Sequence, residues 1–405
     1  MQVLLSSIGS RGDVQPIVAL GLELQALGHR ARLCVAPNFK EWIESYGLEC
    51  TPIGPDLKKM TGGTVPGKPV LPFSKEQLQG LADQMVRGQF QVIGEAARDC
   101  NLIVAAGALQ IATRSIAEAQ NIPYVFAAYC PAVLPSSKYP PPKMNGHFSF
   151  SLPEAENEQL WKEDEESFHK FGAVLNEERA KVGQGLVTNV QGYMFTDRPW
   201  LASDPALAPA FPLTGMEVVQ TGAWMISEET PLPEEVENFL VDGEPPVYLG
   251  FGSMRASDQT AQILLEAVRA LGLRSILSQG WAGLTPDEGT DCLSIGDVNH
   301  AKLFPRMAAI VHHGGAGTTQ TAARAGTPQV IIPHNYDQFY WAHRIQQLGS
   351  GVSGPLRDDI TVDNVAQALR EALQPEVRMR AQEVASRMEL HGARLAAERL
   401  MSEFG

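Results

Sequence analysis

Two adjacent histidines stand before a glycine-rich turn, an arrangement suited to binding an anion. His312 and His313 follow a short apolar run, and the turn Gly314–Gly317 leads into a helix-like stretch that starts near Thr318. Such a turn presents free backbone N–H groups and the positive end of a helix to a phosphate. Adjacent side chains on a strand point to opposite faces, so only one histidine can face the anion. We predict that His313 does so and that His312 is structural.

A carboxylate and an amide follow the next apolar run, at residues 330–332. Asp337 and Gln338 together offer acceptors and donors for the hydroxyls of a sugar, although a solvated loop pair would look the same. One strand–helix–strand crossover separates them from His313, which places both groups at one edge of a parallel sheet. The sequence therefore predicts neighbouring sites for a diphosphate and a sugar.

A bound divalent metal is not expected at this diphosphate site. The chain contains no Asp-x-Asp sequence that could hold such an ion. The helix end, His313, Thr318 and Ser253 would then have to stabilise the leaving group, and one well-placed donor of this kind is worth roughly 3 to 4 kcal/mol. We predict no cofactor and no metal requirement.

The first half of the chain carries a comparable loop, Gly9-Ser10-Arg11-Gly12-Asp13, after an apolar run. Its Gly-x-x-Gly spacing departs from the dinucleotide fingerprint, which disfavours an NAD or FAD enzyme. Asp13 could be a simple helix cap. Facing a diphosphate across a cleft, it could instead be the general base that takes the proton from an acceptor hydroxyl. An aspartate pKa near 4 requires concerted transfer, which favours acidic acceptors such as phenols.

Short apolar runs alternate with helical periodicity along the whole chain, the pattern of parallel sheets with helices on both faces. Strands are expected at 3–8, 31–35, 102–105, 124–127, 247–251, 275–277, 292–295, 310–311 and 330–332. Helices are expected at 17–27, 111–119, 263–271 and 365–373. Both halves open with an apolar strand that runs into a loop rich in glycine and serine. This predicts two doubly wound, Rossmann-like α/β domains that face each other across a cleft.

Composition narrows the class of protein further. A chain of 405 residues is divided most naturally into two domains. The net charge of -14, from 46 acidic and 32 basic residues, argues against general binding to nucleic acid or to anionic membranes. The five cysteines are widely spaced and lack a Cys-x-x-Cys pair, so no disulfide framework or zinc site is expected. Without a secretory signal or a long apolar stretch, we predict a cytoplasmic protein with no membrane insertion.

Several motifs in a fixed order give the chain a specific resemblance over essentially its full length. They are Ser10-Arg11-Gly12-Asp13-x-x-Pro16, Gly250-Phe251-Gly252-Ser253, Gly280-Trp281, Gly296 to His300, His312 to Thr319, Arg324-Ala325-Gly326 and Asp337-Gln338. With them the chain resembles the glycopeptide-antibiotic glycosyltransferases. These enzymes attach sugars to the vancomycin-type aglycone and belong to the inverting GT-B superfamily.

The resemblance implies transfer of a hexose from a UDP- or TDP-sugar to a hydroxyl of a bulky natural-product aglycone, with inversion and with Asp13 as base. It implies that Ser10, Arg11, Ser253, His313, Gly315 and Thr318 lie at the diphosphate, Trp281 and Val298 at the nucleoside, and Asp337 and Gln338 at the sugar. It further implies an acceptor-binding domain at 1–205, a linker at 206–222, a donor domain at 223–380, and a helix at 381–405 that could cross back to the first domain.

Two departures leave substrate choice open. Thr321 stands eight residues after His313, where plant-type relatives usually carry a ribose-binding glutamate, so UDP and TDP are not distinguished. His334 and Asn335, just before Asp337, could alter sugar choice. The acceptor walls implied by the family, at 54–75 and 131–150, could serve a glycopeptide or another aglycone.

Two other functions remain open from the residues alone. The chain could be a nucleotide-sugar epimerase of GT-B fold, which would turn over a sugar without an acceptor. It could also be a non-catalytic partner protein that binds sugar nucleotides. The sequence leaves the oligomeric state undetermined.

Overall fold

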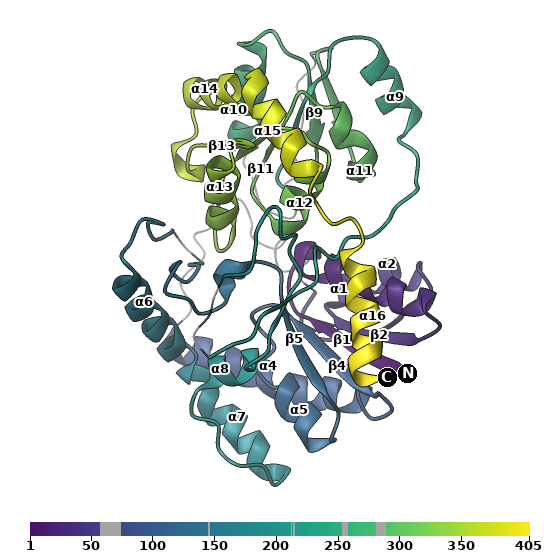
Figure 1. The fold of residues 1–405 in the computed structure, drawn as a ribbon, viewed down its shortest axis with the longest axis vertical. Coiled ribbons are helices and arrows are strands. Elements are labelled where there is room, and N and C mark those ends of the chain that lie inside the picture. Colours follow the sequence, from purple (N-terminus) through teal and green to yellow (C-terminus); the bar gives the residue numbers. More distant parts are fainter. Residues whose placement is uncertain (57–73, 145, 212, 214, 253–257, 281–288) are drawn as a thin grey trace.

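The computed structural model describes residues 1–56, 74–144, 146–211, 213, 215–252, 258–280 and 289–405. The chain folds into two lobes that follow one another along the long axis of the molecule (Figure 1). Each lobe is built on one parallel sheet, with seven strands in the first and six in the second. Separate apolar clusters cover the two faces of each sheet. The doubly wound α/β class predicted from the sequence is confirmed.

The N-terminal lobe has the strand order β3-β2-β1-β4-β5-β6-β7. Its strands are β1 (Gln2–Ser7), β2 (Arg30–Val35), β3 (Glu49–Pro52), β4 (Leu102–Ala106), β5 (Tyr124–Ala128), β6 (Trp200–Leu201) and β7 (Val219–Gln220). Its helices are α1 (Arg11–Ala26), α2 (Lys40–Glu44), α4 (Lys75–Ala96), α5 (Thr113–Ala119), α6 (Glu154–Ser167), α7 (His169–Lys181) and α8 (Val190–Phe195). Val3 and Leu5 pack in the cluster that contains α1, whereas Leu4 packs in the one that contains α4 and α5. Burial on both faces explains why β1 is a continuous apolar run.

The C-terminal lobe has the strand order β10-β9-β8-β11-β12-β13. Its strands are β8 (Val247–Gly250), β9 (Ser275–Ser278), β10 (Cys292–Ile295), β11 (Ala309–His312), β12 (Gln329–Ile331) and β13 (Gly351–Ser353). Its helices are α9 (Glu234–Val241), α10 (Asp258–Arg269), α11 (His300–Leu303), α12 (Ala316–Arg324), α13 (Gln338–Gln347), α14 (Val362–Ala372) and α15 (Pro375–Ala385). All strand pairs are parallel, so every strand ends at the same edge of its sheet.

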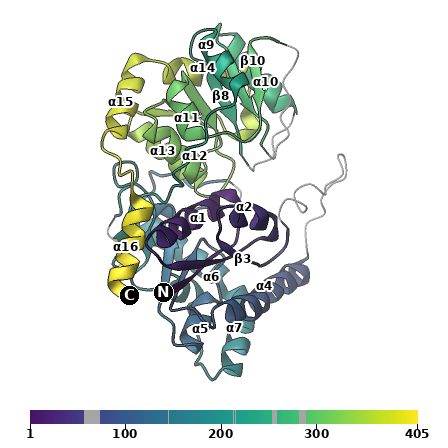
Figure 2. The same ribbon diagram turned by 90° about the vertical axis from the view of Figure 1, so that its right-hand side faces the viewer.

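The chain passes between the lobes near Gly222 and again near Gly392, and these two segments are in contact. The final helix, α16 (Gly392–Phe404), packs against α1 of the N-terminal lobe, as both views show (Figures 1 and 2). A Cβ on Gly392 would lie 2.5 Å from the backbone carbonyl carbon of Gly222, so the two segments can approach this closely only because residue 392 is glycine. Asp204, fully buried, accepts a hydrogen bond from the Glu389 N–H (2.7 Å) and donates its own N–H to Gln320 of α12 (3.1 Å).

Three details differ from the sequence-based expectation. The segment 381–405, expected to be one helix, contains the end of α15 and all of α16, with a break at 386–391 between them. Strand β7 lies inside the segment 206–222, which was expected to be a linker, and pairs with β6. Helix α12 begins at Ala316, two residues before the expected start at Thr318. Two-residue strands and helix starts within a glycine-rich turn carry too little pattern to be recognised from sequence.

Strand order reverses between β1 and β4 in the first sheet and between β8 and β11 in the second. Ligands of doubly wound sheets bind at these switch points, beyond the carboxyl ends of the strands. Asp13 follows β1, and His313 follows β11. The two loops that contain Asp13 and His313 therefore occupy the expected positions for ligand binding in this type of sheet.

Candidate functional site

The carboxylate of Asp13 lies in the first turn of α1, where it caps the helix. Its Oδ2 accepts hydrogen bonds from the Ser10 N–H (2.7 Å) and the Ser10 hydroxyl (3.1 Å). The other oxygen, Oδ1, lies on the side of Gly107, which follows β4. Burial raises the pKa of Asp13, and the hydrogen bonds from Ser10 oppose that rise. One oxygen is thus used by the helix cap while the other remains available at the switch point.

Gly9 makes room for this carboxylate. A Cβ at position 9 would lie 2.2 Å from Asp13 Oδ2, far inside contact distance. We expect Gly9→Ala to lower the free energy of unfolding by about 1–3 kcal/mol, the usual range for overpacking. The matched control is Gly12→Ala, whose Cβ would meet nothing nearer than Ser10 Oγ at 3.6 Å. Thermal unfolding of the two variants compares them, and equal midpoints would contradict the steric argument.

The two histidines after β11 have different environments. His312 is fully buried; its Nδ1 accepts from the Gly314 N–H (3.1 Å) and its Nε2 bonds Gln329 Oε1 (2.9 Å). His313 is half-buried, and its Nδ1 is shielded without a hydrogen-bond partner in the described part of the chain. Burial lowers the pKa of His313 to about 3, so the ring is neutral. His312 is therefore structural, as the sequence predicted, whereas His313 has unused hydrogen-bonding capacity.

His313 stands directly over the start of α12. A Cβ at Gly315 would lie 2.6 Å from His313 Nε2, so only glycine allows this approach. Gly315 is the residue before the helix, and the first backbone bond within it runs from Thr319 N–H to Gly315 O (2.9 Å). The amides of residues 316–318, including that of Thr318, precede that bond and are the free donors of a helix start. The imidazole and these amides together can hold an anion.

Asp337 and Gln338 open α13 beyond β12. Asp337 Oδ2 accepts from the Trp341 indole N–H (3.0 Å), one turn along the helix. Burial, together with the charge of Asp13, raises the pKa of Asp337 to about 7, although the Trp341 bond opposes the rise. Gln338 is buried and holds the preceding loop: its Oε1 accepts from the N–H groups of His334 (2.8 Å) and Asn335 (3.1 Å).

Helix α1, whose first turn holds Asp13, contacts α12 of the C-terminal lobe, which begins beneath His313. Arg11, in the first turn of α1, forms an ion pair with Asp297 of the C-terminal lobe (Nη1 to Oδ2, 3.1 Å). Its guanidinium carbon lies 4.5 Å from the centre of the Trp42 ring. Val298 is half-buried in the loop after β10, next to Asp297. The structure therefore brings both predicted loops to one junction between the lobes.

Comparison with known proteins identifies the family. The chain is 41% identical over 409 residues to the vancomycin aglycone glucosyltransferase of Amycolatopsis orientalis, covering 99% of this chain and 97% of that protein. It is 44% identical to glycosyltransferase GtfC of the same organism, again covering 99% and 97%. The chain belongs to the glycopeptide-antibiotic glycosyltransferase family. A transferase is thereby favoured over the epimerase and the non-catalytic partner protein.

Two family models match this glycosyltransferase. The glycosyltransferase family 28 N-terminal domain matches residues 3–136, and the C-terminal domain of erythromycin biosynthesis protein CIII-like proteins matches residues 292–393. The solved glycosyltransferase of kitacinnamycin superposes with a TM-score of 0.72 at 18% identity, over 100% of this chain and 99% of that one. The calicheamicin glycosyltransferase CalG4 gives 0.71 at 17% identity, over 99% and 97%. The GT-B fold expected from the sequence is confirmed.

Some predicted site residues of the glycosyltransferase cannot be placed. Ser253 and Trp281 lie outside the described residues, as does most of the loop 54–75. Two contacts were missed from sequence: Trp341 on Asp337, and Tyr129, whose hydroxyl donates to the backbone oxygen of Asp13 (2.9 Å). The i,i+4 spacing of Asp337 and Trp341 was a usable signal, as was the position of Tyr129 just after β5.

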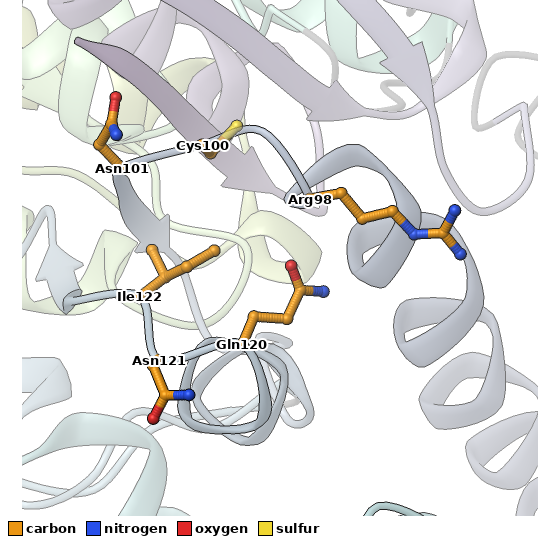
Figure 3. A pocket seen from close by; sticks show the side chains of 6 residues that line it. All are labelled: Arg98, Cys100, Asn101, Gln120, Asn121 and Ile122. Carbon is orange, nitrogen blue, oxygen red and sulfur yellow. The ribbon is translucent and has the colours of Figure 1, made fainter.

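A separate hollow lies elsewhere on the described surface of the glycosyltransferase. A depression of about 580 Å³ is lined by Arg98, Cys100, Asn101, Gln120, Asn121 and Ile122 (Figure 3). These residues precede β4 and β5, so the hollow lies at the amino ends of the strands, opposite the switch point. The side-chain oxygen of Asn101 in this hollow is already hydrogen-bonded, since Oδ1 accepts from the Gln2 N–H (2.8 Å). The hollow is therefore separate from the junction described above.

Across the residues that the structure describes, no group of three or more His, Cys, Asp or Glu side chains is placed to hold a metal ion. Within those same ranges, no helix is both long enough and apolar enough to cross a membrane.

Proposed function

We propose that this glycosyltransferase moves a hexose from a UDP- or TDP-sugar to a hydroxyl of a glycopeptide-like aglycone, with inversion at the anomeric carbon. The N-terminal lobe, 1–205, would bind the acceptor and the C-terminal lobe, 223–380, the donor. The observation that carries the proposal is geometric: α1, which holds Asp13 in its first turn, contacts α12 of the C-terminal lobe, and α12 contacts α13, which begins at Asp337. A base and a sugar-binding carboxylate at one junction are what such a transfer needs.

In the reaction, the acceptor oxygen attacks the anomeric carbon from the face opposite the diphosphate. The bond from that carbon to the phosphate oxygen breaks, and the nucleoside diphosphate leaves with the electron pair. The acceptor proton passes to Asp13, whose Oδ2 is held by Ser10 so that the carboxylate is oriented before the acceptor arrives. A positioned base of this kind contributes roughly 10²- to 10⁴-fold.

The negative charge on the leaving diphosphate would be stabilised without a metal. Its proposed partners are the backbone amide of Gly315, the free amide of Thr318 at the start of α12 and the neutral ring of His313, together with Ser253, which lies outside the described residues. Such groups act strongly because they are already oriented, and one well-placed donor is worth about 3–4 kcal/mol. Arg11 bonds Asp297 through Nη1 only, so its other N–H groups would be available to join Ser10 beside the diphosphate.

The sugar and nucleoside are assigned to the remaining residues. Asp337 is oriented by Trp341 and presents its second oxygen to sugar hydroxyls. Gln338 Nε2 donates to Asn335 Oδ1 (3.2 Å) and has a second hydrogen for the sugar. Val298 and Trp281 would border the base. TDP is bound in the solved glycosyltransferase VinC, which superposes with a TM-score of 0.67 at 19% identity, over 98% of this chain and 100% of that one.

The experiment is an assay of the purified protein with UDP-glucose and TDP-glucose, each with and without vancomycin aglycone. We expect a product heavier by one hexose and release of one nucleoside diphosphate for each product formed, with EDTA without effect. Sugar turnover without aglycone to an epimer, or binding of the nucleotide with neither transfer nor hydrolysis, would contradict the proposal. The ratio of the two donors answers the question that Thr321 left open.

A further inference from the structure

The backbone of Tyr336 has an unusual conformation next to the proposed sugar site. Its φ is +54°, in the left-handed region, although a side chain with a Cβ is disfavoured there. Among the described residues only Asn121 and Thr196 share this property without being glycine. Glycine at position 336 would adopt the same backbone without this penalty. Surrounding contacts must therefore hold Tyr336 in place.

The contact that holds it comes from the other lobe. The Tyr336 N–H donates to the backbone oxygen of Lys143 at 2.7 Å. Lys143 belongs to the segment 131–150, one of the two acceptor walls that the family resemblance implies. That segment also packs on α13. The rings of His147 and Phe339 stack with their centres 4.6 Å apart, and those of Phe150 and His343 do the same at 4.6 Å. Tyr336 thus stands where the acceptor segment meets the donor lobe.

The side chain of Tyr336 is half-buried and directly precedes Asp337 in the chain. Burial raises the pKa of its phenol, and the charges of Asp337, Asp164 and Asp13 raise it further. The phenol is therefore a neutral hydrogen-bond donor under all ordinary conditions. Within the described ranges its hydroxyl makes no hydrogen bond, whereas the Asp164 carboxylate already accepts from Gln191 Nε2 (2.6 Å). A donor without a partner at this place is free to meet a ligand.

We propose that Tyr336 is an acceptor-contacting residue, which decides the acceptors that can place a hydroxyl beside Asp13. The inference rests on the proposed function, because an acceptor hydroxyl must lie between Asp13 and the sugar held by Asp337. The ring of Tyr336 borders that space from the donor lobe and packs against the acceptor, while its hydroxyl donates to an acceptor oxygen. The acceptor site then has a wall from each lobe, and the donor lobe contributes to acceptor choice.

Two variants separate the hydroxyl from the ring. Tyr336→Phe removes only the hydrogen bond, and Tyr336→Gly removes the ring while keeping the left-handed backbone free of strain. With vancomycin aglycone and the better of the two donors, we expect Tyr336→Phe to raise the KM for the aglycone about 3- to 10-fold. We expect Tyr336→Gly to lower kcat/KM for the aglycone about 100-fold, with the KM for the donor within twofold of wild type. Hydrolysis of the donor by water should be unchanged or faster, since the ring no longer excludes water.

Asn121→Gly is the matched control, because Asn121 has a φ of +55° and lies in the hollow at the opposite end of the sheet. It should relieve backbone strain in the same way and leave both KM values unchanged. A parallel rise in the donor KM of the Tyr336 variants would place this side chain in the donor site and overturn the inference, as would wild-type kinetics in both variants. Absence of transfer and hydrolysis by the wild-type enzyme would instead contradict the proposed function, on which the inference depends.

Discussion

Replacing Asp13 with asparagine is expected to reduce turnover by about 10²- to 10⁴-fold while nucleotide binding and folding remain close to wild type. The geometry explains why the two effects separate. Asparagine can turn its carbonyl oxygen toward Ser10 and accept the same two hydrogen bonds that Oδ2 accepts now. The amide nitrogen then replaces Oδ1 and cannot take a proton from the acceptor.

Single-turnover kinetics with saturating donor and aglycone measure the loss, and titration with the nucleoside diphosphate measures binding. Asp13→Ala is the useful comparison, because it also removes the helix cap and should cost about 1 kcal/mol of stability. Turnover near that of wild type in Asp13→Asn would remove Asp13 from the role of base.

The same substitution should change how donor binding depends on pH. The charge of Asp13 is one cause of the raised pKa of Asp337, which is about 7 in the wild-type protein. Asp337 accepts sugar hydroxyls best when ionised, so donor binding should weaken as the pH falls through that value. In Asp13→Asn the neighbouring charge is gone, the pKa of Asp337 falls, and the weakening should move to lower pH.

Replacing His313 with alanine is expected to lower kcat/KM for the donor by about 10²- to 10³-fold, the loss typical of one preorganised donor to a developing anion. The unbound protein should be no less stable, because the variant removes a shielded ring nitrogen that has no partner among the described residues. Measurements of donor binding, turnover and thermal unfolding on the same preparation test the expected loss of activity and the expected unchanged stability.

Whereas His313→Ala is expected mainly to lower activity, His312→Ala, one residue away, is expected mainly to lower stability. It removes the partners of Gly314 and Gln329 from a fully buried position, so it should lower the free energy of unfolding by about 2–4 kcal/mol. Unaltered donor kinetics in His313→Ala would exclude that ring from the diphosphate site. Equal destabilisation by both variants would show that the two histidines are both structural.

The sequence predicted the fold because local pattern and tertiary environment agree in most elements. Strands such as β1 and β11 are buried on both faces and so appear as apolar runs, and the alternation of strand and helix then implies parallel sheets. The different environments of His312 and His313 followed from the alternation of side chains along a strand. The carboxyl ends of β1 and β11 were sufficient to point to Asp13 and His313.

Other features depend on contacts between distant parts of the chain. The left-handed backbone of Tyr336 is held by a hydrogen bond to the backbone oxygen of Lys143 in the other lobe, and no sequence pattern near residue 336 predicts this contact. Gln338 was expected to serve the sugar, yet its side-chain oxygen is used by the loop before it. Strands β6 and β7 have two residues each and depend on their neighbours in the sheet.

The meeting of Gly222 and Gly392 has a consequence for building hybrid enzymes. Because α16 packs on α1, the tail of the chain is part of the N-terminal lobe although it is last in sequence. A hybrid that exchanged everything after residue 222 would bring a foreign α16 onto a native α1. Exchange of a donor lobe between relatives therefore has two natural junctions, one beside each of these glycines, with residues 392–405 retained from the acceptor-side parent.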